Sequence, residues 1–516
     1  MKNKNNSVSV QKKPARPFAL TLCILGLLGC LFLLANGVLF AQESPPVPQA
    51  PGQSNEPSAT EAQKPSRVKR VFRSIKNALS PGEGNENSPP DFEPGLRGNP
   101  SQAAPAIQLQ SDRLQTSTKT KSDTPAKKVL KKITIPITKE GFALAVPGYR
   151  YQFPRDWASH PRYKTEWWYY TGHLYTDDNK RYGYEVTFFR SGLPLKNPPT
   201  RSRWQVKDLY AAHFAITDPT KRQFVIAERL NRNSPFPGTG HALAESDRFY
   251  VNNDTWETWQ IAPKKAMAQK PLVKSPPSFW LHAGMNENDH QKASRRYKLS
   301  LRLTPSKPAI IHGKNGVSQK ADCKGCASHY YSYTNLATTG TLWVNGKPKK
   351  VTGISWMDRE FGSNQLTKAQ TGWDWFSVQL NNKSELMLYV LRNEKIVNGK
   401  VVQYLDPNSS GTLVFSNGKA RHLKKSDFRI KALGHWTSPT TKAAYPMGWQ
   451  VEVPAYKLDV MLRPVMEAQE LVTHQSTRVA YWEGANSVTG TMGGKVVRGV
   501  GYVEMTGYAE QFRQRI

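Results

Sequence analysis

The chain has 516 residues, 38% of them hydrophobic and 10% aromatic, which is too long for one ordinary domain and too apolar for a wholly disordered chain. Of its 72 basic and 39 acidic residues, 17 and 9 precede residue 130, so +25 of the net charge of +33 belongs to the remainder. Such a surface favours anionic partners, and the export predicted below argues against nucleic acid.

Residues 1–42 have the features of an export segment. Five basic residues precede an uncharged run from Pro17 to Gln42, which is long enough to enter a bilayer. Ala41 is a small residue at which signal peptidase could cleave. The bulkier Leu39 two places earlier and the length of the run instead fit a retained membrane anchor. A lipid attached to Cys30 is a third alternative. We therefore expect an extracytoplasmic protein, periplasmic or secreted, either free or tethered to the membrane.

Residues 43–142 are predicted to form a disordered linker. They are rich in Pro, Ser, Gln, Asn and Gly and contain almost no aromatic residue, so they cannot bury enough surface to offset the entropy of ordering. One basic segment at 66–80, which includes Val68, Phe72 and Ile75, has apolar residues at helical spacing. It predicts either a helix that lies on an anionic membrane surface or a transient helix of the linker.

From residue 143 onward the pattern predicts antiparallel β-structure. Short alternating runs such as 184–189, 297–303 and 385–391 indicate strands with one buried face. Two-residue turn signals separate such runs and indicate hairpins. These signals are Asn345-Gly346, Asn398-Gly399, Asn417-Gly418 and Gly493-Gly494.

An internal repeat divides this region in two. Glu166 begins an aromatic strand and a following strand ends at Arg190; Asp374 and Arg392 stand in the same relation about two hundred residues later. The predicted fold is all-β: two tandem antiparallel β-barrels at 143–365 and 366–516.

Four ordered motifs carry a family resemblance. They are Thr165-Glu166-Trp167-Trp168-Tyr169-Tyr170-Thr171-Gly172, Gly353 to Gly362 with Trp356-Met357-Asp358, Gly372 to Leu380 with Trp373-Asp374-Trp375, and Tyr481-Trp482-Glu483-Gly484-Ala485 followed by Gly499 to Tyr508. The region from about 145 to 516 resembles the carotenoid 1,2-hydratase (hydroxyneurosporene synthase) and AttH-like lipocalin family. The resemblance implies two lipocalin-like barrels and an apolar ligand such as a carotenoid, another terpenoid or a lipid. It leaves the reaction open, because fold analogy alone does not fix a function.

Asp358 is the candidate catalytic acid. Adding water to an isolated C=C bond needs a carboxyl that stays protonated, and an apolar pocket raises a carboxyl pKa. Trp356 and Asp358 lie two residues apart, on one face of a strand, and they match the aromatic-x-Asp element thought to supply the proton in the hydratases. Arg359 and Phe361 stand where that family more often has His and Trp. The alternative is a structural Asp358 that accepts backbone or Arg hydrogen bonds, in a non-catalytic lipid-binding or envelope-associated protein.

Other side chains are assigned to the same site with less specificity. His329 precedes a strand-like aromatic segment and is expected to face the cavity opposite Asp358, or else to be an ordinary core or rim histidine like His173, His213 and His282. Aromatic residues are expected to form the ligand-binding wall or the barrel cores. The wall candidates are Trp167, Trp168, Tyr331, Tyr333, Trp356, Trp373 and Trp375.

Four further acids are expected to pair with arginines at barrel ends, namely Glu166, Glu360, Asp374 and Glu483.

Cys323 and Cys326 are predicted to form a local disulfide, because the chain is expected in an oxidising compartment. A zinc site with His312 and His329 is a weaker alternative, since a single CxxC with that histidine spacing matches no zinc module. The sequence contains no dinucleotide, serine-hydrolase or metalloprotease motif. We expect neither a metal nor a cofactor.

Overall fold

The computed structural model describes residues 135–194, 206–233, 242–261, 277–285, 296–364, 366–398 and 400–512. The predicted export segment at 1–42 and the predicted helix at 66–80 lie outside these residues. Within the described part, the helical segments are short 3-10 turns, η1 (Arg155–Trp157), η3 (Lys425–Asp427) and η4 (Pro454–Tyr456), and all other elements are strands. No helix of this part has the length and apolarity needed to cross a bilayer. The prediction of an all-β fold is confirmed.

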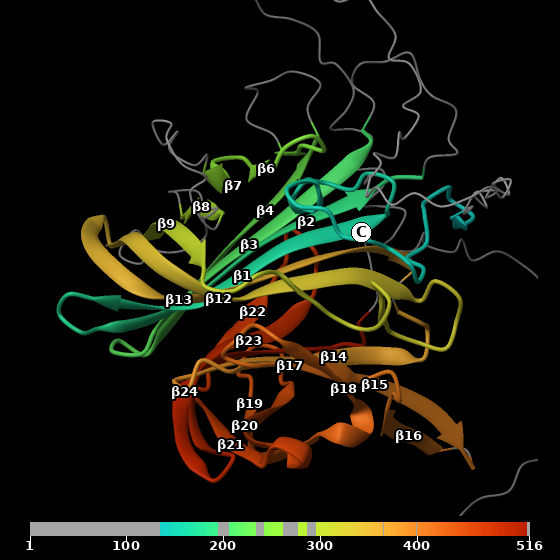
Figure 1. The fold of residues 1–516 in the computed structure, drawn as a ribbon. Helices are drawn as coiled ribbons and strands as arrows, with labels where there is room; N and C mark the ends of the chain where they lie inside the picture. Colours follow the sequence, from blue (N-terminus) through green and yellow to red (C-terminus); the bar gives the residue numbers. More distant parts are fainter. Residues whose placement is uncertain are drawn as a thin grey trace, which may run out of the picture. The chain divides into compact units, whose positions relative to one another are not determined.

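The first sheet has 13 strands in the order β4-β3-β2-β1-β13-β12-β9-β8-β7-β6-β5, with β10 and β11 also paired to β12 (Figure 1). Its strands are β1 (Thr165–Thr176), β2 (Arg181–Gly192), β3 (Asp208–Asp218), β4 (Gln223–Arg232), β5 (Ala242–Ala244), β6 (Tyr250–Asn253), β7 (Trp256–Ile261), β8 (Ser278–Gly284), β9 (Tyr297–Pro305), β10 (Ile310–Ile311), β11 (Ser318–Gln319), β12 (Ala327–Val344) and β13 (Lys347–Asn364). It curls into a barrel around its own apolar core.

The second sheet has 11 strands in the order β18-β17-β15-β14-β24-β23-β21-β20-β19, with β16 paired to β15 and β22 to β23. Its strands are β14 (Gln370–Leu380), β15 (Glu385–Val397), β16 (Lys400–Leu405), β17 (Ser410–Val414), β18 (Ala420–Lys424), β19 (Arg429–Thr437), β20 (Ala444–Val453), β21 (Leu458–Pro464), β22 (Glu470–Val472), β23 (Ala480–Met492) and β24 (Lys495–Thr506). The chain passes from the first sheet to the second between Asn364 and Gln370.

Local sequence explains these strands. In β9, Leu299, Leu301 and Leu303 are buried, while Lys298 and Arg302 on the opposite face are exposed, as expected for alternating side chains with one face on a core. The turn between β12 and β13 places Asn345 and Gly346 at φ of 52° and 79°, the left-handed region that Asn and Gly tolerate best. The predicted hairpins at the other three turn signals are also present.

The two sheets repeat one topology, as the sequence predicted. In each, the first strand pairs both with the second strand and with the last one: β1 with β2 and β13, and β14 with β15 and β24. The repeated acids and arginines pair across these hairpins, Glu166 with Arg190 and Asp374 with Arg392.

A third apolar cluster joins the two sheets. It combines Tyr169, Tyr330 and Trp356 of the first sheet with aromatic and aliphatic residues of β14, β15, β23 and β24. At Gly183 in β2 the approach is so close that an added Cβ would lie 2.7 Å from the Cβ of Ala485. The two barrels are therefore packed directly against each other.

Candidate functional site

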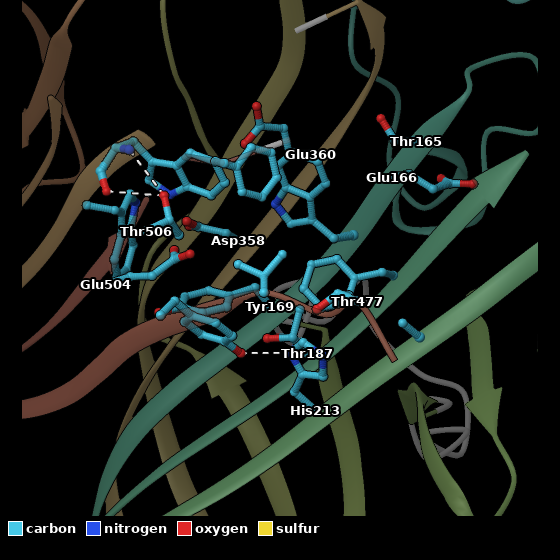
Figure 2. Close-up of a pocket in the computed structure, with 18 of the residues that line it drawn as sticks. Thr165, Glu166, Tyr169, Thr187, His213, Asp358, Glu360, Thr477, Glu504 and Thr506 are labelled. Carbon is cyan, nitrogen blue, oxygen red and sulfur yellow. Dashed lines mark hydrogen bonds between the residues drawn. The ribbon is translucent and has the colours of Figure 1, made fainter. Parts of the chain in front are cut away.

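A cavity of about 230 Å³ opens where the two sheets meet. Its wall is mostly apolar and is formed by side chains from both sheets. The aromatic residues of the wall are Trp167, Tyr169, Phe189, Tyr330, Trp373, Trp375, Tyr389, Tyr481 and Phe512. Its ionisable residues include His213, Lys320, Asp358, Glu360, Glu483 and Glu504. Figure 2 shows Asp358 and Glu504 toward one part of this cavity and Thr187 and His213 toward another, with Tyr169 between them.

Asp358 lies on β13, where it is paired with Tyr169 of β1 and Ser332 of β12, and it is only 4% exposed. Its Oδ2 accepts a hydrogen bond from the Tyr330 hydroxyl (2.5 Å), and its Oδ1 accepts hydrogen bonds from the Trp356 indole (2.5 Å) and from Ser332. Burial raises the pKa of Asp358 to about 7, although the three donors act in the opposite direction. A carboxyl in this state can give up a proton near neutral pH.

Among the described residues, no Lys, Arg or His side chain forms a salt bridge with Asp358. Lys320 interacts electrostatically with Asp358, but its ammonium group pairs with Glu360 at 3.2 Å and lies 4.1 Å from the centre of the Tyr389 ring. Asp358 thus differs from a structural aspartate that pairs with arginine.

A chain of hydrogen bonds connects Asp358 to the second sheet. Ser332, which donates to Asp358, also contacts His312 Nε2 at 2.6 Å, and His312 Nδ1 lies 2.8 Å from the Thr412 hydroxyl of β17. Because Ser332 uses its proton on Asp358, it must accept from His312 Nε2–H, which leaves Nδ1 to accept from Thr412. Burial holds the pKa of His312 well below its usual value, so the imidazole is neutral, as this pattern requires.

Sequence reasoning missed a second group of acids. Glu185 of β2, Glu483 of β23 and Glu504 of β24 interact electrostatically, and Glu483 and Glu504 line the cavity. Burial raises the pKa of Glu185 and of Glu504 to about 8, and burial together with these neighbouring carboxyls raises the pKa of Glu483 well above its usual value. Glu483 and Glu504 lie opposite each other in the β23–β24 hairpin, whereas Glu185 comes from the other sheet, so no local motif connects all three acids.

The prediction that Glu483 pairs with an arginine is wrong. Its Oε1 accepts a hydrogen bond from the Tyr169 hydroxyl at 2.9 Å, and its Oε2 has no hydrogen-bond partner among the described residues. The other three acids do have cationic partners: Glu166 pairs with Arg190 and Arg359, Asp374 with Arg392, and Glu360 with Lys320 rather than an arginine.

His329 does not occupy the expected position opposite Asp358. Side chains alternate along β12, so His329 points away from the face of its neighbour Tyr330, which lines the cavity. Its Nδ1 contacts the Gly316 carbonyl at 2.8 Å and its Nε2 the Tyr163 hydroxyl at 3.0 Å. The histidine that does line the cavity is His213, whose ring contacts the hydroxyls of Tyr481 and Ser476.

The predicted aromatic wall is divided among three locations. Trp167, Trp373 and Trp375 line the cavity. Trp168, Tyr331 and Tyr333 instead belong to the core of the first barrel. Trp356 packs between the sheets and donates its indole N–H to Asp358.

Cys323 and Cys326 form a disulfide in the loop between β11 and β12. Within the described part of the chain, no group of three or more His, Cys, Asp or Glu side chains is arranged to hold a metal ion.

Residues 144–508 match the profile of a family described as AttH-like. A protein assigned as AttH from Nitrosomonas europaea has a similar structure, with 28% sequence identity and a TM-score of 0.58 over 71% of this chain and 99% of that one. No curated protein matches the sequence significantly.

Two further structures are more distant. Kievitone hydratase from Nectria haematococca has 15% identity and a TM-score of 0.47 over 72% of this chain and 96% of its own. CghA has 13% identity and a TM-score of 0.40 over 73% of this chain and 98% of its own. Similarity at this level carries no argument about activity.

Proposed function

Because the chain belongs to the AttH-like family, whose fold encloses the cavity described above, we propose that it binds an apolar, alkene-bearing molecule and adds water to a C=C bond with Asp358 as the acid. The observation that carries this proposal is the position of Asp358: it is buried in a largely aromatic cavity, and no described side chain forms a salt bridge with it. An acid in such surroundings keeps its proton at a pH where ordinary aspartates are ionised.

The proposed reaction balances within the site. The O–H bond of Asp358 breaks as its proton forms a C–H bond at one alkene carbon, and the π electrons leave a carbocation at the other. Water then forms a C–O bond with that carbon and loses a proton, which restores the acid form of Asp358. The reaction is an addition of water and needs no oxidant or reductant.

The cavity wall suits the charge that develops in this reaction. A cation is attracted to the faces of aromatic rings, and Trp167, Trp373 and Trp375 line the same cavity as the acid. Glu504 interacts electrostatically with Asp358 and accepts a hydrogen bond from Trp373. Its carboxylate adds negative potential to the site whenever it is ionised. A polyene or another unsaturated terpenoid is the ligand class that combines apolar bulk with such a bond.

One observation favours the alternative of a binding protein without turnover. Tyr330, Ser332 and Trp356 all donate hydrogen bonds to Asp358, and donors of this kind stabilise the ionised carboxylate. In that case the cavity would hold a lipid or terpenoid, and Asp358 would serve only to organise its wall.

Native mass spectrometry of the full chain with a lipid extract, followed by incubation with acyclic carotenoids, separates these functions. We expect a bound apolar molecule and a hydroxylated product, and we expect Asp358→Asn to lower product formation by roughly 10²- to 10⁴-fold. Asp374→Asn is the matched control, because Asp374 is a half-buried aspartate that pairs with Arg392 and is not part of the cavity wall.

Equal product from the wild type and Asp358→Asn would contradict the catalytic role of this residue. A bound ligand without any product would favour the binding protein. If no apolar molecule binds at all, both functions are wrong.

A further inference from the structure

The β15–β16 hairpin extends beyond the body of the second sheet. Strand β15 pairs with β14 and β17 only through its first part, and from Glu394 to Val397 its described strand partner is β16 alone. Figure 1 shows β16 in a ribbon that projects from the sheet. An isolated two-stranded ribbon is marginally stable in water, so its exposed composition needs an explanation.

Both faces of this ribbon expose apolar side chains. Ile396 and Val401 are opposite each other on one face and are 77% and 64% exposed. Val397 and Val402 lie on the other face and are each 40% exposed. A strand that packs on a protein core buries its apolar face and leaves a polar face in water, but here both faces expose apolar side chains to water.

The charges of the ribbon near its end are all positive. Lys395 and Lys400 share a face with Val397 and Val402, and the segment 395–405 contains no acid. Lys395 also lies over the ring of Tyr404, with its ammonium group 5.2 Å from the ring centre. Tyrosine and lysine with apolar neighbours are typical of side chains placed at a membrane–water interface.

From these observations we propose that the β15–β16 hairpin inserts its end into the headgroup region of an anionic lipid bilayer. A bilayer surrounds an inserted ribbon and can cover both of its apolar faces, whereas a protein partner that docks on a sheet covers one face. The lysines match anionic headgroups, which attract cationic side chains near the membrane surface. This proposal is independent of what occupies the cavity.

The test places a reporter on the hairpin of the full chain. Cys23 and Cys30 are replaced by serine, Ile396→Cys is labelled with an environment-sensitive fluorophore, and vesicles of phosphatidylcholine with or without phosphatidylglycerol are added. Val496→Cys is the matched control, since Val496 is 73% exposed, follows a lysine and lies near the turn of another hairpin, β23–β24. We expect a blue-shifted, brighter signal at position 396 with the anionic vesicles and no such change at position 496.

The lysines have a separate test. Lys395→Gln together with Lys400→Gln is expected to raise the lipid concentration at half response of the 396 label by about 30-fold. No response at position 396, an equal response at 496, or an equal response to vesicles without phosphatidylglycerol would overturn the proposal. A signal that depends on protein concentration without vesicles would show that a second copy of the chain covers the hairpin instead.

Discussion

Asp358 shows how the surroundings of a single carboxyl define what it can do. Burial disfavours its charge, while hydrogen bonds from Tyr330, Ser332 and Trp356 favour it, and the result is a pKa of about 7. The residue is therefore partly protonated at neutral pH and remains within reach of a ligand in the cavity.

The pH dependence of hydration follows from this balance. The acid form of Asp358 is lost as the pH rises through about 7, so we expect the rate to fall above that value. Ser332→Ala removes a donor that stabilises the carboxylate, so it should move the midpoint to higher pH. The pH–rate profile and the pH dependence of the carboxyl infrared band both measure the shift.

Ser328→Ala is the matched control for Ser332→Ala. Ser328 lies on the same strand and is buried, but its hydroxyl has no hydrogen-bond partner among the described residues. Its removal should leave the midpoint unchanged. Identical profiles for the two variants would show that Ser332 does not affect the acid.

Glu185 makes a prediction about stability. Its folded pKa of about 8 lies above the usual 4.5, so between these values the folded state holds a proton that the unfolded state has lost. The free energy of unfolding must therefore fall as the pH rises through this window, by up to a few kcal/mol. Glu185→Gln cannot ionise and should become more stable relative to the wild type between pH 5 and pH 8.

Urea unfolding at both pH values measures the effect of Glu185→Gln. Glu140→Gln is the control, because the Glu140 side chain is 40% exposed and pairs with Lys164 at the surface. If the difference between Glu185→Gln and the wild type is the same at pH 5 and pH 8, Glu185 does not retain its proton in the folded protein.

At the scale of elements, two ion pairs differ in burial: Glu166 of β1 with Arg359 of β13, and Asp374 of β14 with Arg392 of β15. Arg359 and Glu166 have fully buried side chains, whereas those of Arg392 and Asp374 are 13% and 16% exposed. Arg359→Met should lower the free energy of unfolding by about 3–5 kcal/mol, because it leaves the buried Glu166 carboxylate with one partner fewer. Arg392→Met should lower the free energy of unfolding by only about 1 kcal/mol, because water reaches its partner Asp374.

Chemical denaturation of the two arginine variants provides the comparison. Equal losses would mean that the burial of the pair does not determine its contribution. A larger loss for Arg392→Met would reverse the ranking and contradict the argument.

The elements were predictable from sequence because their signals are local. Alternation predicted β9, and Asn345-Gly346 predicted the β12–β13 turn. The same period of two placed Trp356 and Asp358 on one face. It could not say which face of β12 meets the second sheet, and for that reason His329 was assigned to the cavity in place of its neighbour Tyr330. The turn signal Gly493-Gly494 places Glu483 opposite Glu504 in the β23–β24 hairpin. The approach of Glu185 to these two acids depends on how the two sheets pack, which no local pattern encodes.

At the scale of the whole molecule, the two sheets approach each other closely at Gly183. A Cβ at this position would lie 2.7 Å from both the Ala485 Cβ and the Tyr502 hydroxyl oxygen. Gly183→Val should therefore destabilise the protein by about 1–3 kcal/mol and loosen the contact between the sheets. Urea unfolding and limited proteolysis between Asn364 and Gln370 measure the two effects.

Gly434→Val is the control for Gly183→Val, since the nearest atom to a Cβ there is a Met447 carbonyl oxygen at 3.5 Å. It should unfold and resist protease much like the wild type, apart from the small change that any strand substitution brings. Equal behaviour of the two variants would contradict a specific role for the contact at Gly183.

The hydrogen-bond chain from Thr412 through His312 and Ser332 to Asp358 starts in one repeat and ends in the other. Neither repeat alone contains the complete site, so a single-barrel ancestor could have formed it only by associating with another barrel. Once the two barrels were fused, substitutions on the two walls had to remain compatible with each other. The two halves of the gene are therefore expected to evolve as one unit at these positions, even though their folds are separate repeats.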